Sequence, residues 1–331
     1  MESLSVMGFG DALKAYPRLS SLADDLVEHA IKARRRLVLT VDNKGFSIRF
    51  ASRLKRRMKA VGWSVPIIHC VAPTVWAWGR WRAKKIATVM DGLFCLFPFE
   101  PDYFKPFGLD AHFIGHPEAF GSFLPAKPAG ETIKGSRTRF NKIILLPGSR
   151  RSEIKLILPE MLAATAIIKR HDPNLDFVLP AVPHLLPLIK GLVEGSGVTI
   201  LDQPEDLMPA LQTSDAMIAT SGTITLQAAL CGTVGVTCYI TGAFSGFIGR
   251  RLVDLDKAIL PNAILGRPLY PFYFQETATG KTLAAATLDC LYDANAKSSA
   301  RHAAIELKSL LTGGAQSFDE LVISALKNWL D

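Results

Sequence analysis

The chain has 331 residues, of which 49% are hydrophobic and 21% are charged, with 38 basic and 30 acidic side chains. This composition excludes a disordered chain and is typical of a globular protein large enough for two domains. The formal net charge of +8 favours an anionic partner such as a phosphate group, an acidic lipid surface or nucleic acid. No apolar run reaches about 18 residues, so the sequence predicts no membrane-spanning helix.

The first half alternates between strand-like and helical segments, which indicates a parallel α/β domain over residues 1–123. Because no glycine-rich loop and no opening strand are visible, we expect this domain to be incomplete. Its sheet would then expose an edge or borrow a strand from a partner, as in a homodimer. The predicted elements are a helix over Asp11–Ala33, strands near Leu37–Val41, Pro66–Cys70, Gly92–Leu96 and His112–Gly115, and helices near Phe46–Val61, Arg80–Val89 and Asp102–Phe107.

A tryptophan-rich segment follows the second predicted strand. Trp76, Trp78 and Trp81 stand there with Arg80 and Arg82. Tryptophan favours boundaries between apolar and wet surroundings, and arginine pairs with phosphate, so the segment predicts a surface for an amphiphilic ligand or lipid headgroups. The alternative is ordinary packing of the tryptophans inside the protein.

Basic residues are also concentrated in the first half, at Arg34–Arg36 and between Arg53 and Lys59. An anionic membrane attracts such a surface with about 1 kcal/mol per basic residue. The alternative is a solvated helix face. Nucleic acid is not expected as a partner, because no nucleic-acid-binding motif accompanies the charge.

The second half begins after a loop-like stretch at 124–136 and predicts a second parallel α/β domain over residues 124–305. A final helical segment, 306–331, has one apolar face and can pack back on the first domain. The predicted strands lie near Ile143–Leu146, Leu175–Pro180, Val198–Leu201, Ala216–Ala219 and Val234–Cys238, and the predicted helices near Glu153–Arg170, Leu185–Glu194, Asp206–Thr213 and Ile224–Cys231.

Two strand-to-helix turns in this half are candidate phosphate sites. In the first, Gly148, Ser149 and Arg150 connect an apolar strand to a long helix, which places free N–H groups and a positive dipole end beside a guanidinium. Such turns hold diphosphates in α/β proteins. The alternative is a plain turn with a solvated arginine.

The second turn contains Ser221, Gly222 and Thr223, with Gln227 about one turn into the helix. Hydroxyl and N–H groups there can hold phosphate or ribose oxygens, and Gln227 can bond a ribose hydroxyl. A simple helix N-cap is the alternative. Together the two turns favour a nucleotide diphosphate site.

An ordered set of segments resembles a known family, lipid-A-disaccharide synthase, an inverting glycosyltransferase of the GT-B type. The matching segments run along nearly the whole chain: LSVMG at Leu4–Gly8, VAPTVWAW at Val71–Trp78, LFPFE at Leu96–Glu100, FIGH at Phe113–His116, PGSR at Pro147–Arg150, TSGT at Thr220–Thr223, RLV at Arg251–Val253 and LPN at Leu260–Asn262. The resemblance implies two Rossmann-like parallel-sheet domains facing a cleft. It also adds Asn262 to the UDP-binding residues.

The resemblance further implies a reaction. UDP-2,3-diacylglucosamine and 2,3-diacylglucosamine 1-phosphate would give a β-1,6-linked lipid A disaccharide 1-phosphate and UDP, in a Gram-negative bacterium, at the cytoplasmic face of the inner membrane. No metal or other cofactor is expected, because arginine and helix N-termini neutralise the departing UDP. Arg150 is the candidate for that role.

One segment departs from the family's Asp-x-Pro-Asp-Phe pattern. It reads Asp-Asn-Lys-Gly-Phe here, so that Gly45 occupies the position of the proposed general base. Because the acceptor hydroxyl must lose a proton, Asp42 is the nearest remaining catalytic candidate, followed by His69 and His116. The departure leaves a rival open: a catalytically impaired or shortened paralogue that binds UDP-sugar or lipid without turnover. A UDP-sugar epimerase shares the fold but does not explain the tryptophan and basic surfaces.

Overall fold

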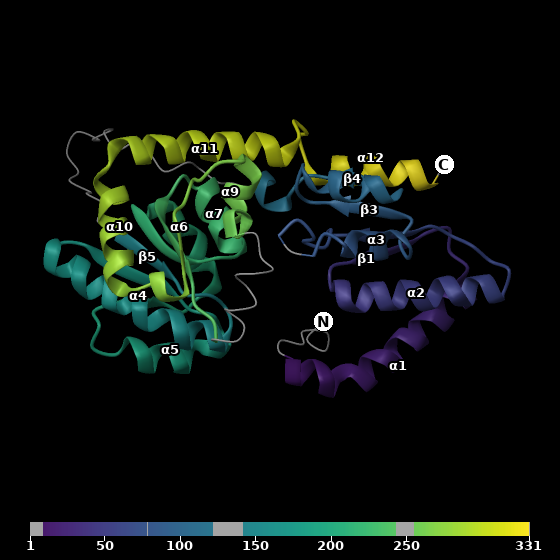
Figure 1. The fold of residues 1–331 in the computed structure, drawn as a ribbon, viewed down its shortest axis with the longest axis horizontal. Coiled ribbons are helices and arrows are strands. Elements are labelled where there is room, and N and C mark those ends of the chain that lie inside the picture. Colours follow the sequence, from purple (N-terminus) through teal and green to yellow (C-terminus); the bar gives the residue numbers. More distant parts are fainter. Residues whose placement is uncertain (1–8, 78, 122–141, 243–254, 331) are drawn as a thin grey trace. The chain divides into compact units, whose positions relative to one another are not determined.

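A computed structural model describes residues 9–77, 79–121, 142–242 and 255–330, and the expected linker at 124–136 lies outside these ranges. The chain divides into two compact units (Figure 1). Unit 1 comprises residues 1–117 and 311–331, and unit 2 comprises residues 118–310. Both sheets contain only parallel pairs, which confirms the expected pair of parallel-sheet α/β domains.

Unit 1 has a four-stranded sheet in the order β1-β2-β3-β4. Its strands are β1 (Val38–Val41), β2 (Ile67–Cys70), β3 (Gly92–Cys95) and β4 (Asp110–Phe113), and its helices are α1 (Phe9–Ala33), α2 (Lys44–Ala60), α3 (Arg82–Ala87) and α12 (Phe318–Leu330). Short 3-10 turns follow β3 and β4: η2 (Glu100–Tyr103), η3 (Lys105–Phe107) and η4 (Pro117–Phe120).

The helix expected over 102–107 is wrong, because two 3-10 turns occupy this segment. Pro101 and Pro106 lack the N–H groups that an α-helix would use, and Gly108 ends the segment in the left-handed conformation.

Side chains of neighbouring residues on β2 enter separate cores on the two faces of the sheet of unit 1. Ile67 packs with Leu54 of α2, whereas Ile68 packs with Ala325 of α12. Helices α1 and α2 accordingly lie on one side of the sheet and α12 on the other (Figure 1). The expected final helical segment, 306–331, consists in the structure of the end of α11 (Ala294–Thr312) and α12.

Strand β1 is one of the two edge strands of this sheet within the described part of the chain, and β4 is the other. Its side chains alternate between half-buried and exposed, and Leu39 and Val41 are exposed by 41% and 62%. Exposed apolar side chains on a strand that is paired on one side only are typical of an edge that can accept a further strand.

Unit 2 has a six-stranded sheet in the order β10-β9-β8-β5-β6-β7. Its strands are β5 (Lys142–Leu146), β6 (Asp176–Pro180), β7 (Thr199–Leu201), β8 (Ala216–Thr220), β9 (Val234–Tyr239) and β10 (Phe272–Phe274). Its helices are α4 (Arg151–His171), α5 (Leu186–Val193), α6 (Leu207–Thr213), α7 (Thr223–Leu230), α9 (Leu260–Leu265), α10 (Gly280–Tyr292) and most of α11, with 3-10 turns η5 (Pro183–Leu185), η6 (Pro204–Asp206), η7 (Leu255–Lys257) and η8 (Gln275–Thr277).

The central strands of unit 2 are almost continuously apolar because helices cover both faces of a parallel sheet. All five residues of β8 are buried, as are four of the five in β5. This sheet fixes where the turns that follow β5 and β8 emerge.

Candidate functional site

The strand order of unit 2 changes direction between β5 and β8. From β5 the chain continues to β6 on one side, whereas β8 lies on the other side, with Leu146 opposite Ala219. Ligands of open parallel sheets bind outside the carboxyl ends of the strands at such a switch point. The turns 147–150 and 220–223 follow the carboxyl ends of these two adjacent strands, where a nucleotide diphosphate site is expected.

At the β5 turn, the side chain of Glu153 bonds the two amides that precede α4. Its Oε2 accepts from the N–H groups of Ser149 and Arg150, both at 3.2 Å, and its Oε1 accepts from Arg150 Nη1 at 2.9 Å. Gly148 has φ +102°, and a Cβ added there would overlap Glu153 Oε2. Glu153 therefore occupies two of the N–H groups expected to be free, those of Ser149 and Arg150 just before the helix, but it makes no bond to the amides of Arg151 and Ser152.

At the β8 turn, the start of α7 has no side-chain cap. Gly222 and Thr223 are exposed and Ser221 is half-buried. Thr220 Oγ1 is buried without a hydrogen-bond partner in the described part of the chain. The N-terminus of α7 is thus an open positive end beside the carboxyl end of β8, available to an anion.

Arg150 supplies the guanidinium beside these turns. Its side chain is 57% exposed, and only Nη1 is engaged by Glu153. The remaining donors of the planar fork can reach phosphate oxygens. The sheet thereby brings six of the predicted residues together at the carboxyl ends of β5 and β8: Gly148, Ser149, Arg150, Ser221, Gly222 and Thr223.

Two further residues predicted to bind the donor lie on nearby helices. Gln227 is half-buried in α7. Asn262 of α9 accepts from the N–H groups of Leu269 and Tyr270 at 2.9 and 3.0 Å and donates from Nδ2 to Tyr270 O at 2.9 Å. Asn262 therefore holds the loop that leads to β10, which leaves one amide hydrogen for a ligand.

In unit 1, non-glycine residues adopt left-handed conformations directly after two strands. Asp42 and Asn43 follow β1 with φ of 49° and 36°, and Val71 follows β2 with φ of 77°. The left-handed conformation is sterically unfavourable for a β-branched residue such as Val71, and strained backbone of this kind clusters at functional sites. Asp42 is exposed, and its carboxylate makes no hydrogen bond or ion pair with any residue that the structure describes.

The two histidines proposed as alternative bases are buried and neutral. Burial lowers the pKa of His69 to about 4 and the pKa of His116 to about 4. His69 Nδ1 lies 2.9 Å from Thr40 Oγ1, and the His116 ring stacks on Phe97. Side chains without solvent access are poorly placed to take a proton from a bound acceptor, so Asp42 stays the favoured candidate.

Trp76 is a core residue, which corrects its expected place on an exposed surface. It is 4% exposed, and its Nε1 donates to Glu100 Oε1 at 3.1 Å. Glu100 Oε2 accepts from the N–H groups of Leu96 and Phe97, both at 3.1 Å. Burial raises the pKa of Glu100 to about 7. The indole N–H is thus used to hold a buried carboxyl group that anchors the turn after β3.

The rest of the tryptophan segment divides by exposure. Trp81 is 71% exposed, and the Arg80 guanidinium lies 5.3 Å from the centre of the Tyr103 ring. Arg82 is half-buried at the start of α3, whereas Trp78 lies outside the described residues. Arg80 and Trp81 are therefore the members that a lipid surface could reach directly.

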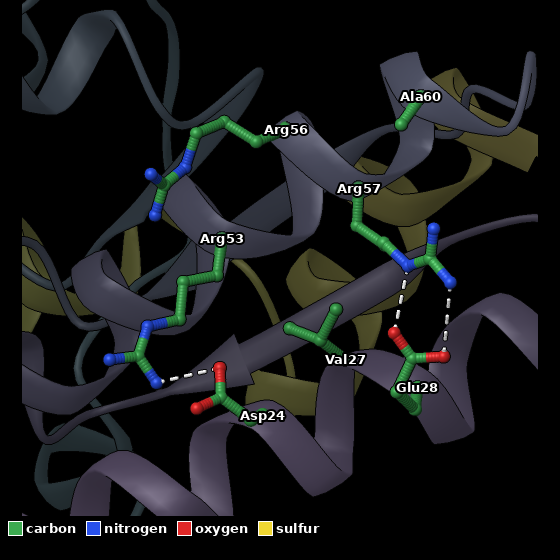
Figure 2. Close-up of a pocket in the computed structure, with 7 residues that line it drawn as sticks. All are labelled: Asp24, Val27, Glu28, Arg53, Arg56, Arg57 and Ala60. Atoms are coloured by element: carbon green, nitrogen blue, oxygen red, sulfur yellow. Dashed lines mark hydrogen bonds and ion pairs between the residues drawn. The ribbon is translucent and has the colours of Figure 1, made fainter.

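A groove of about 590 Å³ lies between α1 and α2 (Figure 2). Arg53 pairs with Asp24 and Arg57 with Glu28, in each case at 2.8 Å. The Arg56 side chain has no hydrogen bond or ion pair with the residues that the structure describes, and it extends away from both acids in the same view. Ion pairing with α1 accounts for two of the three arginines, so only part of the basic charge on this helix is available to an anionic surface.

Neither a metal cluster nor a spanning helix is present in the described ranges. No group of three or more histidine, cysteine, aspartate or glutamate side chains there could hold a metal ion. Among the same residues, no helix is both long enough and apolar enough to cross a bilayer.

Comparison with known proteins identifies close sequence relatives. A family model described as lipid-A-disaccharide synthetase matches residues 1–324. The lipid-A-disaccharide synthase of Paraburkholderia phytofirmans is 35% identical over 338 aligned positions, which cover 99% of this chain and 84% of that protein. The enzyme of the same name from Anaeromyxobacter sp. (strain K) is 33% identical over an alignment that covers 94% of this chain and 80% of that protein.

Solved structures show a shared fold at low identity. A UDP-GlcNAc 2-epimerase from Neisseria meningitidis bound to UDP-GlcNAc gives a TM-score of 0.62 at 11% identity, covering 98% of this chain and 84% of that one. The glycotransferase of kitacinnamycin gives 0.59 at 14% identity, covering 99% and 84%. These likenesses establish the GT-B type of fold.

Proposed function

The chain belongs to the lipid-A-disaccharide synthetase family, glycosyltransferases of lipid A biosynthesis, and from this premise we propose the reaction that it catalyses. UDP-2,3-diacylglucosamine donates its sugar to the 6-hydroxyl of 2,3-diacylglucosamine 1-phosphate. The products are the β-1,6-linked disaccharide 1-phosphate and UDP. The observation that carries the proposal is the pair of turns at the β5–β8 switch point, with Arg150 beside the uncapped start of α7.

The proposed donor site lies in unit 2. The uncapped amides of α7 and the hydroxyls of Ser221 and Thr223 bind the diphosphate, and Arg150 adds a charge-assisted bond. As the bond between the donor's anomeric carbon and the phosphate oxygen breaks, negative charge grows on UDP, and these groups stabilise it. Gln227 and the remaining amide hydrogen of Asn262 are assigned to the nucleoside.

The proposed proton acceptor is Asp42 of unit 1. The acceptor's 6-hydroxyl oxygen forms the new bond to the anomeric carbon from the face opposite to UDP, which inverts the configuration. The hydroxyl proton passes to the Asp42 carboxylate. Support comes from its exposure at the end of β1 and from the burial of both histidines.

Lipid substrates require access to a bilayer, and Arg80 and Trp81 supply an exposed cation and an exposed aromatic ring for that contact. We place the protein peripherally on the anionic cytoplasmic face of the inner membrane. The open edge of β1 is the surface on which we would expect a homodimer to form.

The test is incubation of the purified chain with both diacylated substrates, followed by mass spectrometry of the lipid and nucleotide products. Disaccharide 1-phosphate and UDP in equal amounts support the proposal. Binding of UDP without product would favour the second candidate, an impaired paralogue, for which the absence of a carboxylate at Gly45 is the motivating observation. A C2-epimer formed from a soluble UDP-sugar would instead indicate an epimerase.

A further inference from the structure

Two cations of unit 1 converge on one threonine. Lys44, the first residue of α2, places Nζ 3.5 Å from Thr74 Oγ1. Arg82, the first residue of α3, donates from Nη2 to Thr74 O at 3.4 Å. Both bonds are at the long end of the hydrogen-bond range. The two charges are thus held near each other by segments that follow β1 and β2.

The electrostatics at this point favour an added anion. Lys44 is exposed as a residue, but its ammonium group is partly enclosed. This burial lowers the pKa of Lys44, and repulsion from Arg82 is the second largest cause of the shift. Burial also lowers the pKa of Arg82. A dianionic group between the two cations would offset both effects.

The nearby carboxylates do not form ion pairs with Lys44. Glu100 directs its oxygens to Trp76 and to two backbone amides. Asp42 attracts Lys44, but the two form no ion pair within 4.0 Å among the described residues. Lys44 therefore retains its capacity for a direct charge-assisted bond.

We propose that Lys44 and Arg82 form the binding site for the anomeric phosphate of the acceptor and so select a phosphorylated acceptor over a neutral one. The inference rests on the function proposed above and adds a specificity-determining pair to it. Arginine and lysine are suited to phosphate as a planar fork and a point charge respectively.

The chemistry of the acceptor fits this placement. In a glucosamine 1-phosphate, C1 and the carbon that bears the 6-hydroxymethyl group are joined through the ring oxygen, so the phosphate and the attacking hydroxyl lie near each other. Lys44 follows Asp42 by two residues, at the same end of β1. A phosphate held by Lys44 and Arg82 would keep the 6-hydroxyl within range of Asp42, which converts binding energy into orientation.

The experiment compares two acceptors: diacylglucosamine 1-phosphate and the same lipid with a free 1-hydroxyl group, both in detergent micelles. Equilibrium binding to the UDP-loaded protein and kcat/KM are measured for the wild type, Lys44→Met, Lys44→Arg and Lys281→Met. Lys281 is an exposed lysine in the first turn of α10 and serves as the matched control.

We expect the wild type and Lys281→Met to bind the phosphorylated lipid at least about tenfold more tightly than the neutral one, as for a charge-assisted bond. Lys44→Met should lose most of this preference while its UDP affinity is unchanged, and Lys44→Arg should restore it. Equal affinity of the wild type for both lipids, or an undiminished preference in Lys44→Met, would overturn the inference. Preference without any disaccharide would support the phosphate site and reject the proposed reaction.

Discussion

The role assigned to Arg150 can be tested by its removal. In Arg150→Ala the diphosphate loses a guanidinium donor, and the carboxylate of Glu153 loses its 2.9 Å partner. The Glu153 side chain is only 9% exposed, so its charge stays beside the site and is less compensated than before. Both consequences act against UDP in the same direction.

The expected magnitude follows from the exposure of the group. A hydrogen bond to a charged partner contributes about 1.5–3 kcal/mol, and 1.4 kcal/mol corresponds to a tenfold change in Kd. Because the Arg150 side chain is 57% exposed, solvent screening places the loss near the lower end of that range. We therefore expect UDP to bind about tenfold more weakly, whereas stability should fall by no more than about 1 kcal/mol, as for a surface ion pair.

The assay is titration calorimetry with UDP at low and moderate salt, with Arg151→Ala as the matched control. Arg151 is the adjacent, exposed first residue of α4, and its side chain makes no hydrogen bond or ion pair with any described residue. We expect this control to bind UDP within about twofold of the wild type, since an exposed charge beyond direct contact is screened. An Arg150→Ala protein that binds UDP as the wild type does, or equal losses in both variants, would refute the assignment.

Two further predictions concern stability. Gly148→Ala should lower the free energy of unfolding of unit 2 by about 1–3 kcal/mol, because φ is +102° and the new Cβ would displace Glu153; unchanged thermal unfolding would contradict this reading. Acidification should also destabilise the protein. Because the folded pKa values of His69 and His116 are lowered to about 4, their contribution to stability is lost as pH falls below 6.5. The folded pKa of Glu100 is raised to about 7, so its protonation over the same range makes the folded protein more stable. With two groups opposing one, urea unfolding should show a net loss of about 1 kcal/mol per pH unit between pH 6.5 and 4.5, and a rise in stability would contradict the burial of the histidines.

The sequence predicted most of the sheets, because their strands are short apolar runs between helical segments. The run Ile143–Leu146 became β5 (Lys142–Leu146), and Ala216–Ala219 became β8 (Ala216–Thr220). The three-residue edge strand β10 was not predicted, since Phe272–Phe274 is too short for periodicity to show. Helix α10 and the part of α11 before residue 306 were also not predicted from the sequence.

The site was less predictable than the fold. The positions of Arg150 and the Ser221 turn follow from chain order, but the capture of two amides by Glu153 depends on side-chain geometry. The glutamate three residues after the N-cap was the signal that could have revealed it. For Trp76, sequence alone did not distinguish an exposed ring from one that donates to the buried Glu100. Glutamate is itself rarely buried, so composition gave no warning.

The most direct test of the account is acceptor-dependent release of UDP by the wild type and by Asp42→Asn. Asparagine keeps the size of the side chain but cannot take a proton, so we predict release by the wild type only when the acceptor is present. We further predict a loss of at least about a hundredfold in kcat for Asp42→Asn, with UDP affinity retained. UDP release that is independent of the acceptor, or full turnover in Asp42→Asn, would contradict the central claim.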